Sequence, residues 1–204
     1  VVKGVRKTKS KFGGRLELTS HVAFQMFEGR GELGIVTQAE TLDRFANLRT
    51  DPNLFANASA MLEVVDHFAL DQENDTRRYE MLVGALKTLD SDPAPLVVPA
   101  FFLKLLTHEG LEPQLDRCTR CDSNGPLVSI DYHEGGVLCE KCRRGRVISE
   151  GSVAVMRSIL GGGLSMALAV KDEQVCAEVE SIAHEAIEFH LERRLRSRKV
   201  IDQT

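Results

Sequence analysis

The sequence is poor in large aromatic side chains, because its 204 residues include no tryptophan and only two tyrosines. It also has no apolar run of the roughly eighteen residues that a membrane-spanning helix requires, so we expect no membrane segment. No secretory signal is visible, and we expect the chain to work inside the cell, where thiols stay reduced. With 43% apolar residues, the chain can still bury a core of ordinary size.

Short motifs that mark common enzyme classes are missing as well. There is no Gly-x-x-x-x-Gly-Lys phosphate loop and no Gly-x-Ser-x-Gly nucleophile turn. His184-Glu-Ala-Ile-Glu188 is close to the helix motif of zinc proteases, but Glu188 stands where that motif has its second histidine. We therefore predict that the protein is not an enzyme. A metal-dependent hydrolase stays open as an alternative, and it would need a metal site with a histidine or carboxylate ligand.

Four of the five cysteines form two Cys-x-x-Cys pairs, Cys118 with Cys121 and Cys139 with Cys142, separated by 17 residues. Each pair makes a tight turn that aims both sulfurs inward, and this spacing is typical of a zinc site with four thiolate ligands. We predict one structural Zn²⁺ per chain, with no open position for a reacting water. Two disulfides, or four unrelated core cysteines, are the competing interpretations. Cys176 lies outside the pattern, and we expect it to be a small buried side chain.

The segment between the two cysteine pairs has the pattern of a short β-hairpin. Residues 127–132 alternate in polarity, and Gly135 and Gly136 can take the positive backbone angles of a tight turn. Together with the cysteines, this pattern predicts a zinc ribbon over residues 116–146.

The net charge of −4 hides an uneven distribution of charge. Of the 26 basic residues, 15 lie in three short segments without an interspersed acid, and the rest of the chain holds 11 basic against 30 acidic residues. Such separation favours a polyanion-binding surface on an acidic body, although each segment could also be a solvated tail. The segments contain Lys3, Arg6, Lys7, Lys9, Lys11 and Arg15; Lys141, Arg143, Arg144 and Arg146; and Arg193, Arg194, Arg196, Arg198 and Lys199.

The hydrophobic pattern predicts an α+β fold with two domains. Strand patterns over residues 1–5, 16–18, 21–27 and 33–37 predict the remainder of a small β-barrel over residues 1–37, whose first strands precede Val1. From Gln38 the apolar spacing becomes helical, so residues 38–204 form a helical domain into which the ribbon is inserted. Asp51 and Pro52 predict the start of its first long helix, and Gly110 predicts a left-handed cap at the end of the helix through Leu106. The apolar stripes are Phe55, Ala58, Leu62, Val65 and Ala69; Tyr79, Leu82, Leu86 and Leu89; Phe101, Phe102, Leu105 and Leu106; Val153, Met156, Ile159 and Leu160; and Val175, Val179, Ile182, Ala186 and Phe189.

Several segments of the chain follow one another in a recognisable order. They are the basic opening over residues 1–12, Leu16-Glu-Leu-Thr-Ser-His-Val22, Gln38-Ala-Glu40, residues 106–121 ending in the first cysteine pair, Gly135-Gly-Val-Leu-Cys139, and the closing Phe189-His-Leu-Glu-Arg-Arg-Leu-Arg-Ser-Arg-Lys199. In this order they resemble the RecO family of bacterial recombination mediators and DNA repair proteins. The resemblance covers essentially the whole chain.

The resemblance implies an N-terminal oligonucleotide-binding (OB) β-barrel, a helical domain and a zinc module. It implies binding of single- and double-stranded DNA, annealing of complementary strands and, with RecR, loading of RecA onto strands coated by single-stranded-DNA-binding protein. A bacterial cytoplasmic, nucleoid-associated protein is expected. An RNA-binding or transcription-associated zinc-ribbon protein is the alternative that the same basic segments permit.

Candidate binding residues follow from charge and from this resemblance together. A lysine-rich loop on a barrel can track a phosphate backbone, and Phe12 and Phe24 are the local candidates for stacking on unpaired bases. We expect the acidic C-terminal tail of the single-stranded-DNA-binding protein to bind at residues 99–111 together with the basic C-terminal segment. The candidate DNA-binding residues are Lys3, Arg6, Lys7, Lys9, Lys11, Arg15, Arg196 and Arg198.

Overall fold

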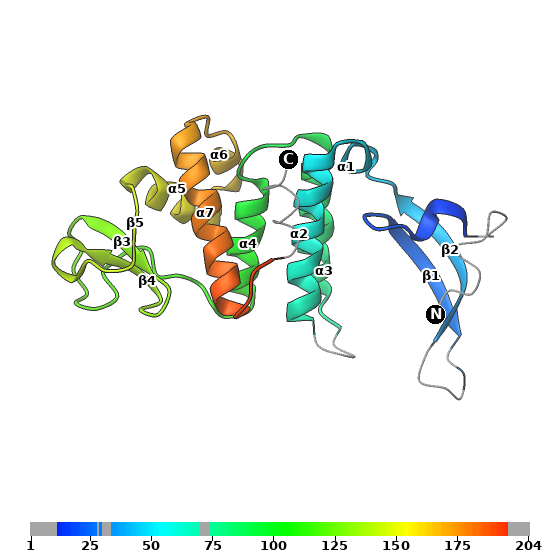
Figure 1. The fold of residues 1–204 in the computed structure, drawn as a ribbon, viewed down its shortest axis with the longest axis horizontal. Coiled ribbons are helices and arrows are strands. Elements are labelled where there is room, and N and C mark those ends of the chain that lie inside the picture. The colour runs from blue at the N-terminus through cyan, green and yellow to red at the C-terminus, as the bar shows by residue number, and fades with distance from the viewer. Residues whose placement is uncertain (1–11, 28, 30–33, 70–73, 196–204) are drawn as a thin grey trace.

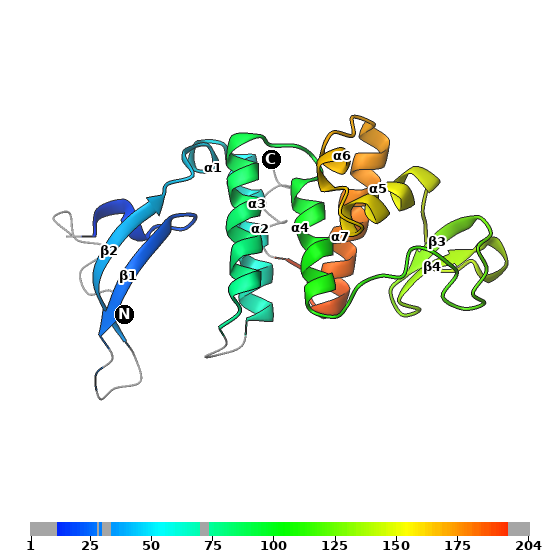
Figure 2. The ribbon, with the colours of Figure 1, turned by 180° about the vertical axis from the view of Figure 1, so that it is seen from behind.

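The computed structural model describes residues 12–27, 29, 34–69 and 74–195. The fold is α+β, with a two-stranded sheet at one end, helices in the middle and a three-stranded sheet at the other end (Figure 1). The view from behind shows the same order along the long axis (Figure 2). The elements are η1 (Gly13–Leu16), β1 (His21–Phe27), β2 (Ile35–Asp43), α1 (Ala46–Thr50), α2 (Pro52–Phe68), α3 (Thr76–Ser91), α4 (Val97–His108), β3 (Leu127–Asp131), β4 (Gly136–Cys139), η2 (Glu140–Cys142), β5 (Arg146–Val147), α5 (Glu150–Leu160), α6 (Leu164–Leu168) and α7 (Glu173–His190).

The N-terminal strands form an antiparallel hairpin, and its bounds differ from the prediction in two places. Residues 13–16 form the 3-10 helix η1, so the predicted strand over residues 16–18 is wrong. Strand β2 does not end at residue 37 but continues to Asp43, because its ladder with β1 runs on until His21 pairs with Asp43. Helical structure therefore begins at Ala46 and not at Gln38. The predicted strand over residues 1–5 lies outside the described residues.

Helix α2 begins where the sequence predicts, but it buries a different face. Asp51 caps it by accepting hydrogen bonds from the N–H groups of Asn53 (2.8 Å) and Leu54 (3.2 Å), with proline in the first turn. Of the predicted stripe, Ala58 is fully buried but Phe55 is 38% exposed, and the other fully buried side chains of the helix are those of Met61 and Val64. The reason is that α2 packs against α1, α3 and α4 together, which rotates its buried face.

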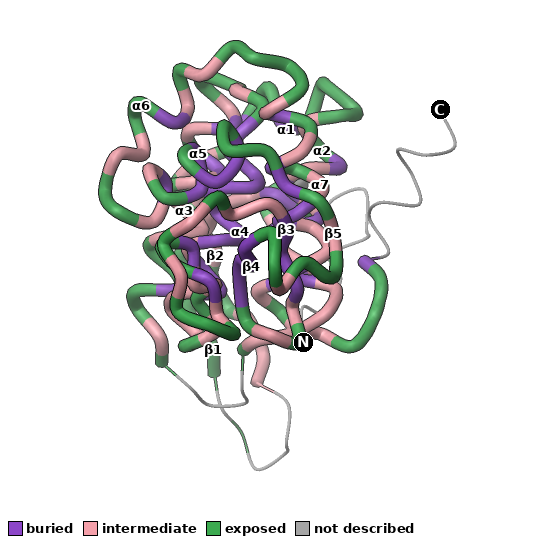
Figure 3. The backbone as a smooth tube through the Cα atoms, turned by 90° about the vertical axis from the view of Figure 1, so that its left-hand side faces the viewer, coloured by how far each residue is buried: buried purple, intermediate pink, exposed green. Residues whose placement is uncertain are grey.

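Helix α4 is the centre of the molecule. Nine of its twelve residues are buried, and a helix that is apolar on all sides belongs inside a core. It packs against α3 on one side and against α5 and α7 on the other, and the buried backbone gathers around it (Figure 3). Helix α4 is followed by Gly110, whose φ of +75° is left-handed, as predicted for its cap. The backbone N–H of Leu111 then donates to Leu106 O at 2.8 Å.

The C-terminal helices agree with the predicted stripes. Helix α5 buries Val153, Met156 and Ile159 and ends before Gly161, and α7 buries Val179, Ile182 and Ala186. These side chains form one core cluster with α2 and α4, so the helices on both sides of the ribbon in sequence belong to the same body. No helix in the described part of the chain is long and apolar enough to span a membrane.

Phe102 tests the central position of α4 most directly. Its side chain has no exposed surface and meets the His184 ring edge-on at a centroid distance of 5.0 Å. We predict that Phe102→Ala lowers the free energy of unfolding by about 3 to 5 kcal/mol, because it leaves a cavity between helices. Urea unfolding followed by circular dichroism measures the change. Met166→Ala, at a side chain that is 70% exposed on α6, is the control and should change stability by less than about 0.5 kcal/mol. Equal unfolding midpoints for the two variants would contradict the packing described.

Candidate metal centre

The first cysteine pair lies in a tight loop after the linker from α4. The N–H of Cys118 donates to Ser123 O at 3.0 Å, and the N–H of Asp122 donates to Cys118 O at 2.9 Å, which closes the loop on itself. Asp122 has a φ of 61°, a left-handed conformation that aspartate tolerates better than most residues. The N–H of Thr119 donates to Val137 O at 3.0 Å, so the loop is tied to strand β4.

The second cysteine pair follows directly from the hairpin, which has the predicted antiparallel strands β3 and β4. Gly135 has a φ of +76°, as predicted for the turn. At Gly136 a Cβ atom would lie 2.2 Å from Gln114 O, so only glycine fits where the linker crosses the strand. Cys139 ends β4, and the short helix η2 then turns the chain back as far as Cys142.

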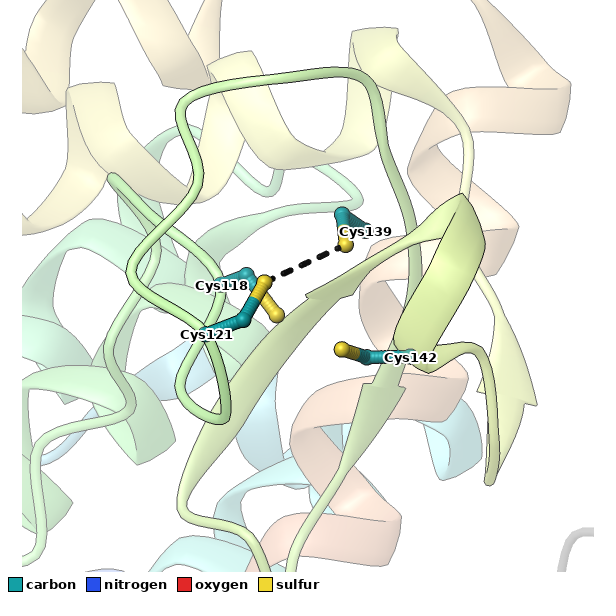
Figure 4. Close-up of side chains that lie close together, drawn as sticks. All are labelled: Cys118, Cys121, Cys139 and Cys142. Atoms are coloured by element: carbon teal, nitrogen blue, oxygen red, sulfur yellow. Dashed lines mark hydrogen bonds between the residues drawn. The ribbon is translucent and has the colours of Figure 1, made fainter.

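The four sulfurs meet between the two loops (Figure 4). All four lie within 4.8 Å of one another, and the sulfurs of Cys121 and Cys139 are 3.6 Å apart. A tetrahedral Zn²⁺ with Zn–S distances of about 2.3 Å requires sulfurs about 3.8 Å apart, so the spacing fits that ion. None of the five cysteines, all of which lie in the described part of the chain, forms a disulfide. The interpretation as two disulfides is therefore wrong for this structure.

The four cysteines also change the pKa values of one another's thiols. Burial alone would raise the pKa of Cys118, but hydrogen bonds from the backbone N–H groups of Cys139, Cys121 and Arg120 outweigh it and lower that pKa to about 6. The neighbouring Cys121 thiol, with burial, raises the pKa of Cys142 to about 12. Deprotonation of the first thiol is therefore favourable. Deprotonation of a second thiol is unfavourable, because two negative charges would then lie side by side. A divalent cation among the sulfurs removes this conflict, so the donor set suits a soft divalent metal ion.

A second cluster, Asp75, His108 and Glu109, has metal-ligand atoms of the right kinds within 4.8 Å of one another. His108 Nε2 lies 2.6 Å from Asp75 Oδ2, and the Arg78 guanidinium lies 2.9 Å from Glu109 and 3.3 Å from Asp75. Because arginine already supplies the positive charge, we interpret this cluster as an ion-pair network that joins α3 to α4. His108, in the last turn of α4, belongs to this network.

The three-stranded sheet of the ribbon is fixed to helix α7 by a polar cluster that the sequence did not predict. Tyr132 Oη lies 3.2 Å from both Ile182 O and the Glu185 carboxylate, and burial together with Glu185 raises the pKa of Tyr132. Arg146 donates to Ser181 Oγ at 2.7 Å and pairs with Glu185. These partners are 35 to 53 residues apart in sequence, and no short motif brings them together.

The linker into the ribbon is fixed as well. Arg157 of α5 donates through Nε to Leu115 O at 3.0 Å and lies 3.2 Å from the Asp116 carboxylate. The ribbon therefore has a defined position on the helical body at both ends of its sequence.

The basic residues of the ribbon are partly neutralised within the module. Arg144 lies 3.1 Å from Asp131 and 3.2 Å from Glu134, and Arg146 pairs with Glu185. In the described part of the chain, Lys141 and Arg143 are exposed and make no ion pair. The ribbon segment is thus a weaker candidate for a polyanion surface than its sequence indicates.

Most of the predicted DNA-binding residues lie in the parts of the chain that the structure does not describe. Lys3, Arg6, Lys7, Lys9, Lys11, Arg196 and Arg198 lie outside the described residues, whereas Arg15 is described and exposed at the end of η1. The start of the basic C-terminal segment is held on the body, because Arg193 lies 3.3 Å from Glu63 of α2 and Leu195 is buried. Of the two stacking candidates, Phe12 is 2% exposed and unsuited to that role, and Phe24 is 54% exposed.

The sequence matches known protein families over both of its halves. The family model described as Recombination protein O C terminal matches residues 49–199, and the model described as Recombination protein O N terminal matches residues 1–45. The chain belongs to the RecO family. Its relatives include proteins named DNA repair protein RecO from Frankia casuarinae (36% identical, covering 97% of this chain and 83% of the relative), Streptomyces coelicolor (36%, 100% and 86%) and Thermobifida fusca (33%, 100% and 85%).

Membership of the RecO family gives the chain a role in DNA repair and recombination, as the resemblance predicted. The four-cysteine cluster is compatible with one structural zinc ion in this RecO chain. The cluster holds sulfur ligands only, so it lacks the histidine or carboxylate that the hydrolase alternative requires.

The metal prediction is tested by composition and by one substitution. Protein purified without chelator should contain about one equivalent of zinc, because four thiolates form a closed tetrahedral site. Cys139→Ser should lose most of that zinc and loosen the ribbon, while α2, α4 and α7 keep their own core and most of the helical circular dichroism signal. The control is Cys176→Ser, which removes a thiol outside the cluster and should retain the zinc. Less than half an equivalent in the unaltered protein would contradict the prediction.

Proposed function

We propose that this RecO chain is a nonenzymatic mediator of DNA repair and recombination in the bacterial cytoplasm, associated with the nucleoid. In this role it binds single- and double-stranded DNA, anneals complementary strands and, with RecR, helps load RecA onto strands coated by single-stranded-DNA-binding protein. The observation that supports it most is the match of both halves of the chain, in order, to the RecO family.

We propose that Cys118, Cys121, Cys139 and Cys142 hold one structural Zn²⁺ in a ribbon over residues 116–146. When bound, zinc neutralises two of the four thiolate charges and needs no further ligand from water or substrate. The chain's own contribution is to bring the two loops together and to supply backbone N–H donors to Cys118. The ribbon then acts as a rigid part of the helical body through its contacts with Glu185 and Arg157.

We propose that the β1–β2 hairpin, which continues past the predicted boundary at residue 37 to Asp43, belongs to an OB-type barrel, and that the helical domain follows from Ala46. The exposed apolar side chains on one face of the β1–β2 hairpin favour this proposal. Phe24 and Met26, on alternate positions of β1, are 54% and 51% exposed. Apolar side chains on a two-stranded sheet need further strands to cover them. Phe27, which the sequence reasoning missed, is 61% exposed and lies on the opposite face, where it is a further candidate for stacking on bases.

The basic N-terminal segment should bind DNA through phosphates. Each phosphate contact releases a condensed counterion, so three or four engaged side chains give a log-log salt slope of about −2 to −3 on single strands. Replacing Lys7, Lys9 and Lys11 with alanine together should flatten that slope by about two units and leave zinc content unchanged. Salt titrations with fluorescent oligonucleotides measure it.

A matched control separates the effect of this segment on DNA binding from the effect of the overall charge. Replacing Arg77, Lys87 and Lys171, three exposed basic residues of the helical body, removes the same charge and should leave the slope within about half a unit of the parent. Equal slopes for the parent and the Lys7, Lys9, Lys11 variant would show that the segment is only solvated. Equal competition by a matched RNA oligomer would favour the RNA-binding alternative.

We propose that the acidic, apolar C-terminal tail of the single-stranded-DNA-binding protein binds in a groove beside α4. A groove of about 340 Å³ lies between α3, α4 and α6, with Ala100 and Phe101 on its apolar lining and Lys104 and Glu80 as its two charged residues. It overlaps the predicted stretch over residues 99–111. An apolar groove that presents a lysine fits a peptide with apolar side chains and a carboxylate.

Charge reversal in the groove tests this assignment. Lys104→Glu should weaken binding of a synthetic tail peptide at least about tenfold, because a favourable charge contact becomes repulsive. Lys87→Glu reverses a charge on α3 outside the groove and should bind nearly as the parent does. Fluorescence anisotropy with labelled peptide measures both. Unchanged affinity of the intact coating protein after deletion of its tail would remove the proposal.

A further inference from the structure

One of the four clustered cysteines is more exposed to solvent than the others. Cys121 is exposed, whereas Cys118 and Cys139 are only 1% and 5% exposed and Cys142 is half-buried. Small oxidants react with thiolates that they can reach. Access therefore selects Cys121 as the first sulfur to react.

A second cysteine is in position to complete the reaction. Cys139 Sγ lies 3.6 Å from Cys121 Sγ, across the gap between the two loops (Figure 4). Redox-active cysteines commonly combine an accessible thiolate with a neighbouring thiol that resolves the oxidised product. A disulfide needs an S–S distance of about 2.05 Å, so the two loops have to close by about 1.5 Å.

We propose that Cys121 is a peroxide-reactive thiolate and that Cys139 is its resolving partner, so that oxidation releases the bound metal and unlocks the ribbon. This inference rests on the proposed zinc site. The Cys121 thiolate attacks one oxygen of hydrogen peroxide, the O–O bond breaks, and hydroxide leaves while a sulfenic acid forms. The Cys139 thiolate then attacks the Cys121 sulfur, which forms the S–S bond and expels a second hydroxide. Two thiolates lose two electrons in all, one peroxide gains them, and the acid form of the buffer protonates the two hydroxides.

The release of metal follows from the loss of ligands. Zinc that keeps only two sulfur ligands, Cys118 and Cys142, is no longer held in a closed site. Strand β4 ends at Cys139, and its hairpin carries Tyr132 to the Glu185 contact on α7. The change should therefore loosen the ribbon on the body while the core around α4 stays folded.

The sequence makes the disulfide easy to assign. No lysine or arginine lies between Cys121 and Cys139, so trypsin leaves both in one peptide, residues 121–141. Cys118 and Cys142 fall in the separate peptides 118–120 and 142–143. The proposed bond therefore appears as an unalkylated 121–141 peptide that lacks two hydrogens, and any pairing with Cys118 or Cys142 joins two peptides.

The experiment uses the full chain, with its zinc content measured first. Hydrogen peroxide is added in steps, zinc release is followed with a chromogenic chelator, and alkylated samples are mapped without reduction. We expect about one zinc released per peroxide consumed and the 121–141 internal disulfide as the first product. A first disulfide that includes Cys118 or Cys142 would overturn the inference but leave the zinc site intact. Protein that contains no zinc before peroxide is added would overturn both.

Two variants test the order of reaction. Three thiolates and one imidazole also form a closed zinc site, so Cys121→His and Cys118→His can each keep the metal. Cys121→His should release zinc at least about tenfold more slowly than Cys118→His, because it lacks the accessible thiolate. Equal release rates would overturn the inference, and if either variant binds no zinc, the disulfide map of the unaltered chain decides.

Discussion

Four cysteine sulfurs within 4.8 Å of one another cannot all ionise unless a cation lies among them. The pKa of Cys118 is lowered by hydrogen bonds from backbone N–H groups, whereas the pKa of Cys142 is raised by its contact with Cys121, which is the same conflict seen at single thiols. The cluster has little apolar cover of its own, since its buried members are Cys118, Leu138 and Cys139. A module with so small a core depends on a metal ion to hold its loops, as small zinc domains do.

The ribbon is not an independent appendage, because it is fixed to the body on the side away from the metal. Ile130 and Val137 pair across the hairpin and belong to the main core, so the β3–β4 hairpin contributes to the same core as α4. Tyr132 and Arg146 add hydrogen bonds to α7, which fix the orientation of the hairpin on that helix. The chain therefore places the β1–β2 hairpin and the ribbon at opposite ends of one helical body (Figure 1).

Local signals in the sequence predicted local features well. The spacing of the cysteines predicted the cluster, Asp51 with Pro52 predicted a helix start, and Gly110 predicted a helix end, because each depends on a few neighbouring residues. Features that depend on distant partners were not predictable. The apolar spacing from Gln38 predicted helical structure, but the pairing of residues 38–43 with β1 decides that they form a strand. The buried face of α2 and the contact between Arg146 and Glu185 likewise depend on helices far away in sequence.

We propose that four sulfurs, and nothing else, hold one metal ion at the junction of the two loops. X-ray absorption spectroscopy at the zinc edge, on protein purified without added metal, identifies the atoms that bind the ion. We expect a single shell of four sulfur atoms at about 2.3 Å from zinc. A nitrogen or oxygen atom in that shell, at about 2.0 to 2.1 Å, would contradict it.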